Sequence, residues 1–236
     1  MSLQDAIATG KICLHFQPII DLSTDCCVGY EALSRWVESG VVYGPPSFLP
    51  AILGSELERS LVERQIIELN VARRWLDEHG QGDVFLAYNL SLPSLLWSDL
   101  QQLLGRWDDN PNRLWLEVPE KYSVTKEGSG MRQLKALSMA GFKIESDDFG
   151  VAWANFSRFL SDIYDGIKID RSIIQGCSQD KRKRALIRAI VAISDEMSMT
   201  TIAEGIDNAD DAQCCTFLNV QMGQGYLFGK AKPLGA

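Results

Sequence analysis

Two adjacent carboxylates, Asp147 and Asp148, close an apolar run of the sequence and are followed at once by Phe149 and Gly150. Neighbouring residues of a strand point to opposite faces, so both carboxylates can serve one site only where the strand ends and the backbone turns. A metal site is one use of such a pair. A solvated turn is the alternative, because Asp and Gly are both common in turns.

Other polar side chains stand near the ends of the remaining expected strands: Glu31, Asn89, Glu117, Lys168, Asp170, Glu204 and Gln224. Each alone could be an ordinary surface group, but in a barrel these strand ends meet at one mouth. Several carboxylates crowded there would repel one another, and removing them from water is costly unless they are paired. Hard divalent cations can neutralise them, and carboxylate and amide oxygens suit magnesium, manganese or calcium rather than zinc. An Asp shared by two ions about 3.5 to 4 Å apart would suit phosphoester hydrolysis.

Short β-branched or aromatic runs alternate with longer amphipathic stretches along the chain, which is typical of repeated βα units. The expected strands are Ile12 to Ile20, Cys27 to Leu33, Val84 to Leu90, Arg113 to Val118, Phe142 to Asp147, Gly166 to Asp170, Thr200 to Glu204 and Gln224 to Phe228. The expected helices are Leu57 to His79, Pro93 to Arg106, Ser129 to Ala140, Lys181 to Met197 and Ala209 to Leu218.

Eight strands with interleaved helices predict an α/β protein with a (β/α)8 barrel, the TIM-like fold. The first two strands are joined only by residues 21–26. A parallel pair needs a longer crossover, so these two strands should run antiparallel. With 236 residues and no evident linker, the chain is expected to form one domain.

The composition limits the kinds of partner. A net charge of −8 argues against a nucleic-acid polymer. The six cysteines lack C-x-x-C spacing, and no run is apolar enough to span a bilayer, so we expect a cytoplasmic segment with reduced thiols and no membrane contact. Of the two histidines, His15 is expected in the core and His79 at a helix end.

The sequence does not fit a protein kinase, although it contains one kinase-like motif. Asp148, Phe149 and Gly150 spell the magnesium motif of kinases. However, neither histidine stands in an H-R-D sequence, and no G-x-G-x-x-G precedes the motif.

The ordered set of motifs resembles the EAL domain, the bacterial cyclic di-GMP phosphodiesterase. The resemblance rests on Gln17-Pro18, Glu31-Ala32-Leu33 with Arg35, Asn89-Leu90-Ser91, Leu116-Glu117, Asp147-Asp148-Phe149-Gly150, Lys168-Ile169-Asp170, Ala203-Glu204-Gly205 and Gln224-Gly225-Tyr226. It covers essentially the whole chain, residues 1–236. It implies a TIM-like barrel with one antiparallel strand, hydrolysis of cyclic di-GMP to linear pGpG, and a homodimer. The resemblance is also compatible with a domain excised from a longer signalling protein with sensory or cyclase domains.

The same resemblance implies a role for each matching residue. Two magnesium or manganese ions would be held by Glu31, Asn89, Glu117, Asp147, Asp148 and Glu204. Lys168 would position the attacking water or stabilise charge, and Glu204 would also assist proton transfer. The ligand would be contacted by Gln17, Leu33, Arg35 and Asp170, with Gln224 supporting the site. Glu120 would anchor a loop that links the metal site to the dimer interface.

Several residues depart from the family pattern. Residues 151–155 read Val-Ala-Trp-Ala-Asn where the family usually has Thr-Gly-Tyr-Ser-Ser, Pro119 replaces a usual Thr, and Asp207 replaces a usual Glu. The Ala-Glu that follows the family's Phe-Ile-Pro run is also missing after Pro50. These changes keep open a second hypothesis, a catalytically weak cyclic di-GMP receptor that signals through a partner. The complete acid set favours the hydrolase.

Overall fold

The computed structural model describes residues 1–119, 128–150 and 159–235. Its strands are β1 (Ile12–Asp21), β2 (Cys27–Glu38), β3 (Val41–Tyr43), β4 (Phe85–Asn89), β5 (Leu114–Pro119), β6 (Lys143–Phe149), β7 (Gly166–Ile169), β8 (Thr200–Ala203) and β9 (Met222–Gly223). Its α-helices are α1 (Leu3–Ala8), α2 (Leu49–Ile52), α3 (Glu56–Glu78), α4 (Leu92–Leu95), α5 (Leu100–Leu104), α6 (Ser129–Met139), α7 (Arg171–Ile174), α8 (Lys181–Glu196) and α9 (Ala209–Phe217). Two short 3-10 turns span Pro45–Ser47 and Pro111–Arg113.

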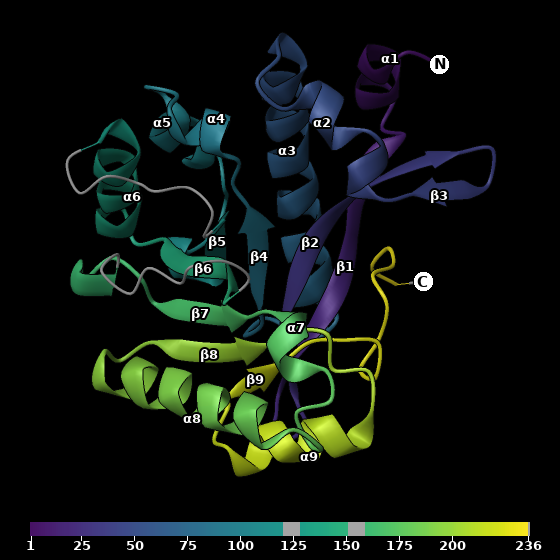
Figure 1. Cartoon of the computed structure of the whole chain (residues 1–236). Coiled ribbons are helices and arrows are strands. Elements are labelled where there is room, and N and C mark those ends of the chain that lie inside the picture. Colours follow the sequence, from purple (N-terminus) through teal and green to yellow (C-terminus); the bar gives the residue numbers. More distant parts are fainter. Residues whose placement is uncertain (120–127, 151–158, 236) are drawn as a thin grey trace.

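The described strands form a closed barrel. They follow one another in the order β3, β2, β4, β5, β6, β7, β8, β9, β1, and an additional pairing of β1 with β2 joins the two ends. Eight strands therefore close the barrel, while β3 pairs only with β2 and extends from it as a hairpin. The predicted α/β barrel is confirmed, and Figure 1 shows the hairpin projecting from it.

The antiparallel strand is β1. It pairs antiparallel with β2 over nine residue pairs, from Ile12 opposite Trp36 to Ile20 opposite Cys27, and also antiparallel with β9. From β2 through β4 to β9, successive barrel strands pair in parallel. The short link between the first two strands thus correctly predicts their direction.

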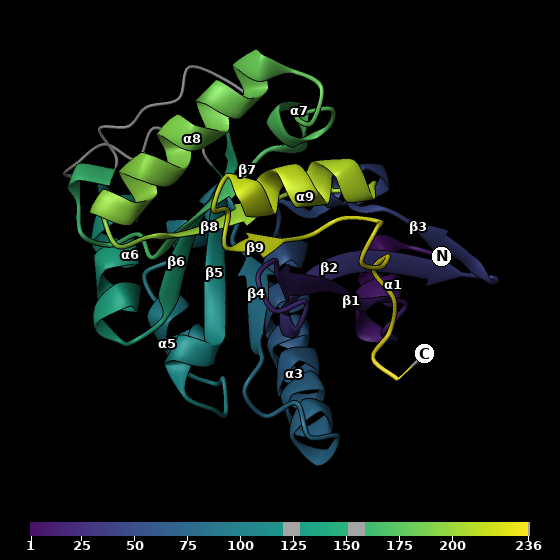
Figure 2. The same ribbon diagram turned by 90° about the horizontal axis from the view of Figure 1, so that it is seen from below.

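The longer helices lie outside the strands, with α3, α6, α8 and α9 around the barrel (Figures 1 and 2). Helix α3 begins after Ser55, whose side chain accepts a hydrogen bond from the Leu57 amide, as expected of an N-cap. Its inner face buries apolar side chains such as Leu61, Ile66 and Leu69. The main core lies between strands and helices.

The inside of the barrel has two chemically different levels. One level is apolar and contains a cluster of Ile19, Phe85, Ala87 and Ile202, with Trp115 stacked on Phe85 at 4.2 Å between ring centroids. Polar side chains fill the other level, toward the carboxyl ends of the parallel strands. Polar ligands can therefore be bound at the mouth, above an apolar floor.

Two predicted elements are wrong, and strand β3 and the short helices α1, α2 and α7 were not predicted. The last strand is β9 at Met222–Gly223, whereas residues 224–228 form a turn in which the Phe228 amide donates to the Gly225 carbonyl at 3.1 Å. The predicted helix from Pro93 to Arg106 is two short helices, α4 and α5. Strand β3 was not predicted at all, because its three residues pair only with the outer end of β2.

Both histidines lie where the sequence predicts. His15 is buried in β1, and burial lowers its pKa. His79 follows the last turn of α3, with its Nδ1 2.7 Å from the Trp75 carbonyl oxygen and its ring stacked on Trp75.

Candidate functional site

Carboxylates from four strand ends converge on one lysine at the barrel mouth. The ammonium Nζ of Lys168, on β7, lies 2.8 Å from Glu204 Oε1, 2.9 Å from Glu117 Oε2, 3.4 Å from Asp147 Oδ1 and 3.5 Å from Glu31 Oε2. The lysine side chain is only 1% exposed. Parallel strand ends meet at the same rim, which is how residues separated by up to 173 positions come into contact.

Glu31 is held on both carboxylate oxygens. Asn89 Nδ2 donates to Glu31 Oε1 at 2.9 Å, and Gln224 Nε2 donates to Glu31 Oε2 at 2.6 Å. Burial would raise the pKa of Glu31, but Lys168 and these two amides lower it below its ordinary value. Glu31 is therefore an ionised, oriented carboxylate.

The strand ending at Asp147 and Asp148 is irregular, as the adjacent pair requires. The pairing of β6 with β7 shifts register between Ser146 and Phe149, and Asp148 has φ 55°. This left-handed conformation is uncommon for residues other than glycine, although Asp and Asn tolerate it better than most. One carboxylate oxygen from each Asp and one from Glu204 lie within 4.8 Å of one another. The bulge thus lets neighbouring residues face one site.

The pKa values of two other side chains at the mouth, Glu117 and Lys168, are shifted from their ordinary values. Burial, followed by the charge on Glu31, raises the pKa of Glu117 well above its ordinary value. Burial would lower the pKa of Lys168, but Asp147, Glu117, Glu204 and Glu31 raise it well above its ordinary value. The lysine consequently stays charged, while Glu117 holds its proton more tightly than an ordinary glutamate does.

Glu204 follows β8 and is the most exposed of the acids paired with Lys168, with 19% of its side chain exposed. Burial raises the pKa of Glu204 to about 8, against the opposing effect of the Lys168 ammonium. Asp147 and Glu31 add to the rise. Glu204 therefore combines access from solvent with a strong affinity for a proton.

A further acid, Glu145, lies inside the barrel and was not predicted as a site residue. It is fully buried on β6, opposite Glu117 of β5 in the register of the sheet. Burial raises the pKa of Glu145 to about 8, against the effect of Lys168. The sequence carried the signal, since Lys143, Glu145 and Asp147 alternate along one strand and so share a face.

The mouth residues fit the predicted divalent cations. Glu117 Oε1 is buried and accepts no hydrogen bond within the described part of the chain. The amide nitrogen of Asn89 is used by Glu31, so its oxygen is the atom available as a ligand. A carboxylate set with one amide oxygen is the donor chemistry of magnesium or manganese.

A groove of about 630 Å³ lies on one side of the acid cluster. Its lining includes the predicted ligand contacts Gln17, Leu33, Asp170 and Gln224, together with Glu31, Asp148, Glu204, Asp207 and Tyr226. Asp170 also caps α7 by accepting the Ser172 amide at 2.8 Å. Arg35 does not line this groove as the described residues define it, and its Nη1 donates to the Ser34 carbonyl at 2.8 Å.

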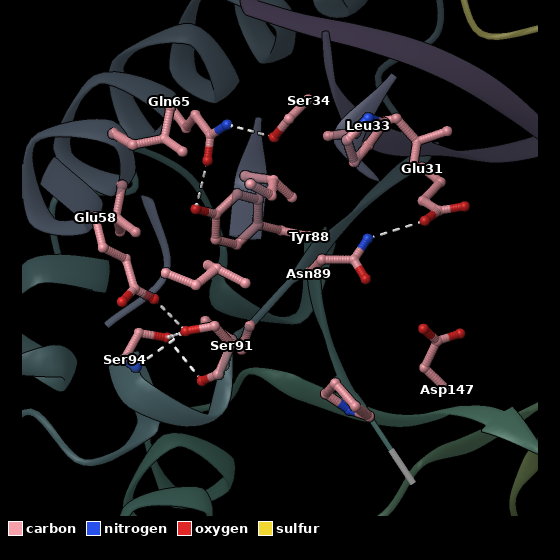
Figure 3. A pocket seen from close by; sticks show the side chains of 18 residues that line it. Glu31, Leu33, Ser34, Glu58, Gln65, Tyr88, Asn89, Ser91, Ser94 and Asp147 are labelled. Carbon is pink, nitrogen blue, oxygen red and sulfur yellow. Dashed lines mark hydrogen bonds between the residues drawn. The ribbon is translucent and has the colours of Figure 1, made fainter. Parts of the chain in front are cut away.

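A second cavity, of about 380 Å³, opens on the other side of the cluster (Figure 3). Glu31, Asn89 and Asp147 stand at one end, and its apolar lining includes Leu49 and Leu53. The far end is polar, where Ser91 Oγ donates to Glu58 and lies near Ser94, while Tyr88 donates to Gln65 at 2.8 Å. The acid cluster is thus flanked by two recesses.

Two predictions fall on residues outside the described ranges. These are Glu120 as a loop anchor and the altered segment 151–155. Asp207, another departure, accepts hydrogen bonds from Gln175 Nε2 at 3.0 Å and from the Tyr226 amide at 3.2 Å.

Known proteins resemble the chain in sequence and in fold. The model of the EAL domain family matches residues 1–231. PdeB of Escherichia coli (strain K12), named a probable cyclic di-GMP phosphodiesterase, is 30% identical over 240 residues, which are 98% of this chain and 45% of PdeB. The cyclic di-GMP phosphodiesterase RocR of Pseudomonas aeruginosa is 26% identical, over 95% of this chain and 58% of RocR.

The solved structure of the PaMucR phosphodiesterase in complex with c-di-GMP superposes with a TM-score of 0.88 at 28% identity. The match covers 98% of this chain and 96% of that one. The chain spans less than half the length of PdeB. Among the described helices, none is long and apolar enough to cross a membrane.

Proposed function

The chain belongs to the EAL domain family, and on this premise we propose that it hydrolyses cyclic di-GMP to linear pGpG with two magnesium or manganese ions. The observation that carries the proposal is the convergence of Glu31, Glu117, Asp147 and Glu204 on Lys168. Such a cluster gives two divalent cations enough oxygen ligands. PdeB and RocR are named as cyclic di-GMP phosphodiesterases, which supports cyclic di-GMP as the substrate.

The proposed ligands are Glu31, Asn89, Glu117, Asp147, Asp148 and Glu204. Two bound ions would supply an activated water and would stabilise the charge that develops on the attacking and leaving oxygens. The chain's own contribution is to hold the ligands in place. Asn89 and Gln224 orient Glu31, and the bulge of β6 turns both aspartates to the same side.

Hydrolysis forms one phosphorus–oxygen bond from water and breaks the bond from phosphorus to a ribose 3′-oxygen. A proton must leave the water, and the departing oxygen must gain one. We assign assistance in this transfer to Glu204, which is partly exposed at the mouth and lies 2.8 Å from Lys168 Nζ. We assign to Lys168 the positioning of the water or the stabilisation of negative charge, and its ion pairs with Glu117 and Glu204 support this role.

The two recesses suit a ligand with two bases. The groove near Gln17 and Tyr226 and the cavity near Tyr88 lie on opposite sides of the acid cluster. A cyclic dinucleotide placed with one phosphate at the cluster could extend a guanine toward each. We assign ligand contacts to Gln17, Leu33, Arg35 and Asp170, with Gln224 in support.

The receptor alternative is not favoured, because no member of the expected ligand set is missing. We propose further that residues 1–236 act as one module of a longer cytoplasmic signalling protein, with sensory or cyclase domains, and as a homodimer. The chain matches only 45% of PdeB, and this supports its being one module of a longer protein.

The test is to incubate the purified protein with cyclic di-GMP, with and without magnesium or manganese, and to separate the products chromatographically. We expect pGpG to appear only with the metal. Absence of product at high enzyme concentration would reject the hydrolase. Binding of cyclic di-GMP without turnover would instead establish the receptor.

A further inference from the structure

Glu145 occupies an unusual place beneath the barrel mouth. It is 0% exposed, it stands directly across from Glu117 in the sheet register, and it precedes Asp147 by two residues on the same face of β6. Its carboxylate thus lies inside the barrel, below the acids that contact Lys168.

The Glu145 carboxylate has no hydrogen-bond partner within the described part of the chain. Both of its oxygens are buried without a donor. The ammonium of Lys168 forms its four ion pairs with Glu31, Glu117, Asp147 and Glu204 instead. A buried carboxylate without a partner is costly, so this one calls for an explanation.

The neighbouring strand makes room for this carboxylate. A Cβ atom placed on Gly166 of β7 would lie 2.8 Å from Glu145 Oε1 and 2.7 Å from Thr200 Oγ1, closer than real Cβ contacts. The Thr200 hydroxyl itself donates to the Asp165 carbonyl at 3.1 Å. Glycine at 166 therefore fits the presence of glutamate at 145, and the acid is built into the barrel interior.

We propose that Glu145 strengthens the binding of divalent cations at the barrel mouth by its negative charge, without being a ligand. The inference rests on the proposed function. The described acids that could share a cation are Asp147, Asp148 and Glu204, and Glu145 is not among them. A divalent charge a short distance above an unpaired buried carboxylate is attracted strongly, because little water screens the pair.

The test is calorimetric titration of the purified protein with Mn²⁺ in mildly alkaline buffer, without cyclic di-GMP. Glu145→Gln keeps the shape of the side chain and removes its charge. We expect its dissociation constant for Mn²⁺ to rise about tenfold or more at unchanged stoichiometry. The matched control is Glu68→Gln, which removes the same charge from α3, where Glu68 accepts the Leu14 amide at 2.8 Å outside the barrel. Its affinity should stay close to that of the wild type.

Each other outcome has a definite meaning. Equal Mn²⁺ affinity of Glu145→Gln and wild type would overturn the inference and leave the proposed function intact, whereas a wild type that binds no Mn²⁺ would remove the proposed function. Loss of one bound ion in the variant would make Glu145 a ligand and would also overturn the through-space role. If Glu145→Gln does not fold, Glu145→Ala takes its place, with the same weakened binding expected.

Discussion

Lys168 is the residue that holds the described acids of the mouth together. Four carboxylates lie 2.8 to 3.5 Å from its ammonium, and the side chain is almost completely buried. Removing one partner of a buried ion pair leaves the other charge uncompensated, which costs more than the pair contributes.

We therefore expect Lys168→Met to lower the free energy of unfolding of the metal-free protein by about 3 to 5 kcal/mol. Added Mn²⁺ should recover a large part of this loss, since the cations replace the missing positive charge. Urea unfolding with and without Mn²⁺ measures both effects. A variant as stable as wild type in the absence of metal would show that the four acids do not depend on the lysine.

Glu31 offers a direct test of the assigned ligands. Glu31→Ala removes a carboxylate that is oriented from both sides by Asn89 and Gln224. We expect turnover to be abolished through loss of bound metal, which chromatography of the products and calorimetry with Mn²⁺ would show together. Unchanged activity would remove Glu31 from the ligand set.

Asp148 has two separable roles, one conformational and one chemical. Its φ of 55° is tolerated by Asn but is strained for a β-branched residue. We expect the free energy of unfolding of Asp148→Asn to lie within about 0.5 kcal/mol of the wild-type value. That of Asp148→Val should be lower than wild type by roughly 1 to 3 kcal/mol. Both should lose most of their activity. Equal stability of the two variants in urea would show that the bulge does not constrain this position.

Residue types near strand ends predicted most of the acids that the structure brings together, because strand parity and a common barrel rim are simple geometric rules. Glu145 was missed for a physical reason. Polar residues are expected at the mouth and not one layer deeper, where burial is costly. Only the space left by Gly166, a residue of another strand, makes that position available.

Among the elements, α3 is tied at its start to the segment that follows β4. Glu58 accepts the Gly54 amide at 2.6 Å through Oε2 and the Ser91 hydroxyl through Oε1, while Ser55 caps the helix. Glu58 stands three residues after Ser55, the spacing of a capping box. It links the helix to one wall of the cavity in Figure 3.

We expect Ser55→Ala to cost about 1 kcal/mol of unfolding free energy, as for other N-caps. Glu58→Ala should cost more, because it also leaves the Gly54 amide and the Ser91 hydroxyl without their partner. Urea unfolding of the two variants side by side decides the order. Equal losses would contradict the larger contribution expected of the two Glu58 contacts.

The elements were predictable where a single strand or helix has its own periodic pattern. The break between α4 and α5 depends instead on contacts from elsewhere, since Gln133 Nε2 donates to the Trp97 carbonyl at 2.7 Å and Arg59 pairs with Asp99 at 2.6 Å. The last strand is short because Gly225 packs against the backbone of Ile206. Neither contact is visible in a local sequence window.

For the whole molecule, the buried acids predict an unusual dependence of stability on pH. Burial raises the pKa values of Glu145 and Glu204 to about 8, whereas a glutamate in an unfolded chain titrates near 4.3. Between these values the folded protein binds more protons than the unfolded chain, so this contribution to stability falls as the pH rises toward about 8.

We expect the Tm of the metal-free protein to fall from about pH 5 to about pH 8, and Mn²⁺ to remove most of that fall. Thermal melts over this range would show it. The variant Glu145→Gln should give a shallower slope than wild type. A wild-type Tm that rises steadily with pH would contradict the raised pKa values.

The tethered ammonium of Lys168 has a consequence for how the domain survives changes in its surroundings. A counter-ion fixed to β7 cannot diffuse away, so the carboxylates keep one positive charge among them when the solution holds few divalent ions. We expect the barrel to stay assembled under such scarcity while its chemistry stops. The concentration of divalent ions would then control the activity of each molecule but not the number of folded molecules. When the ions return, activity would resume without new protein synthesis.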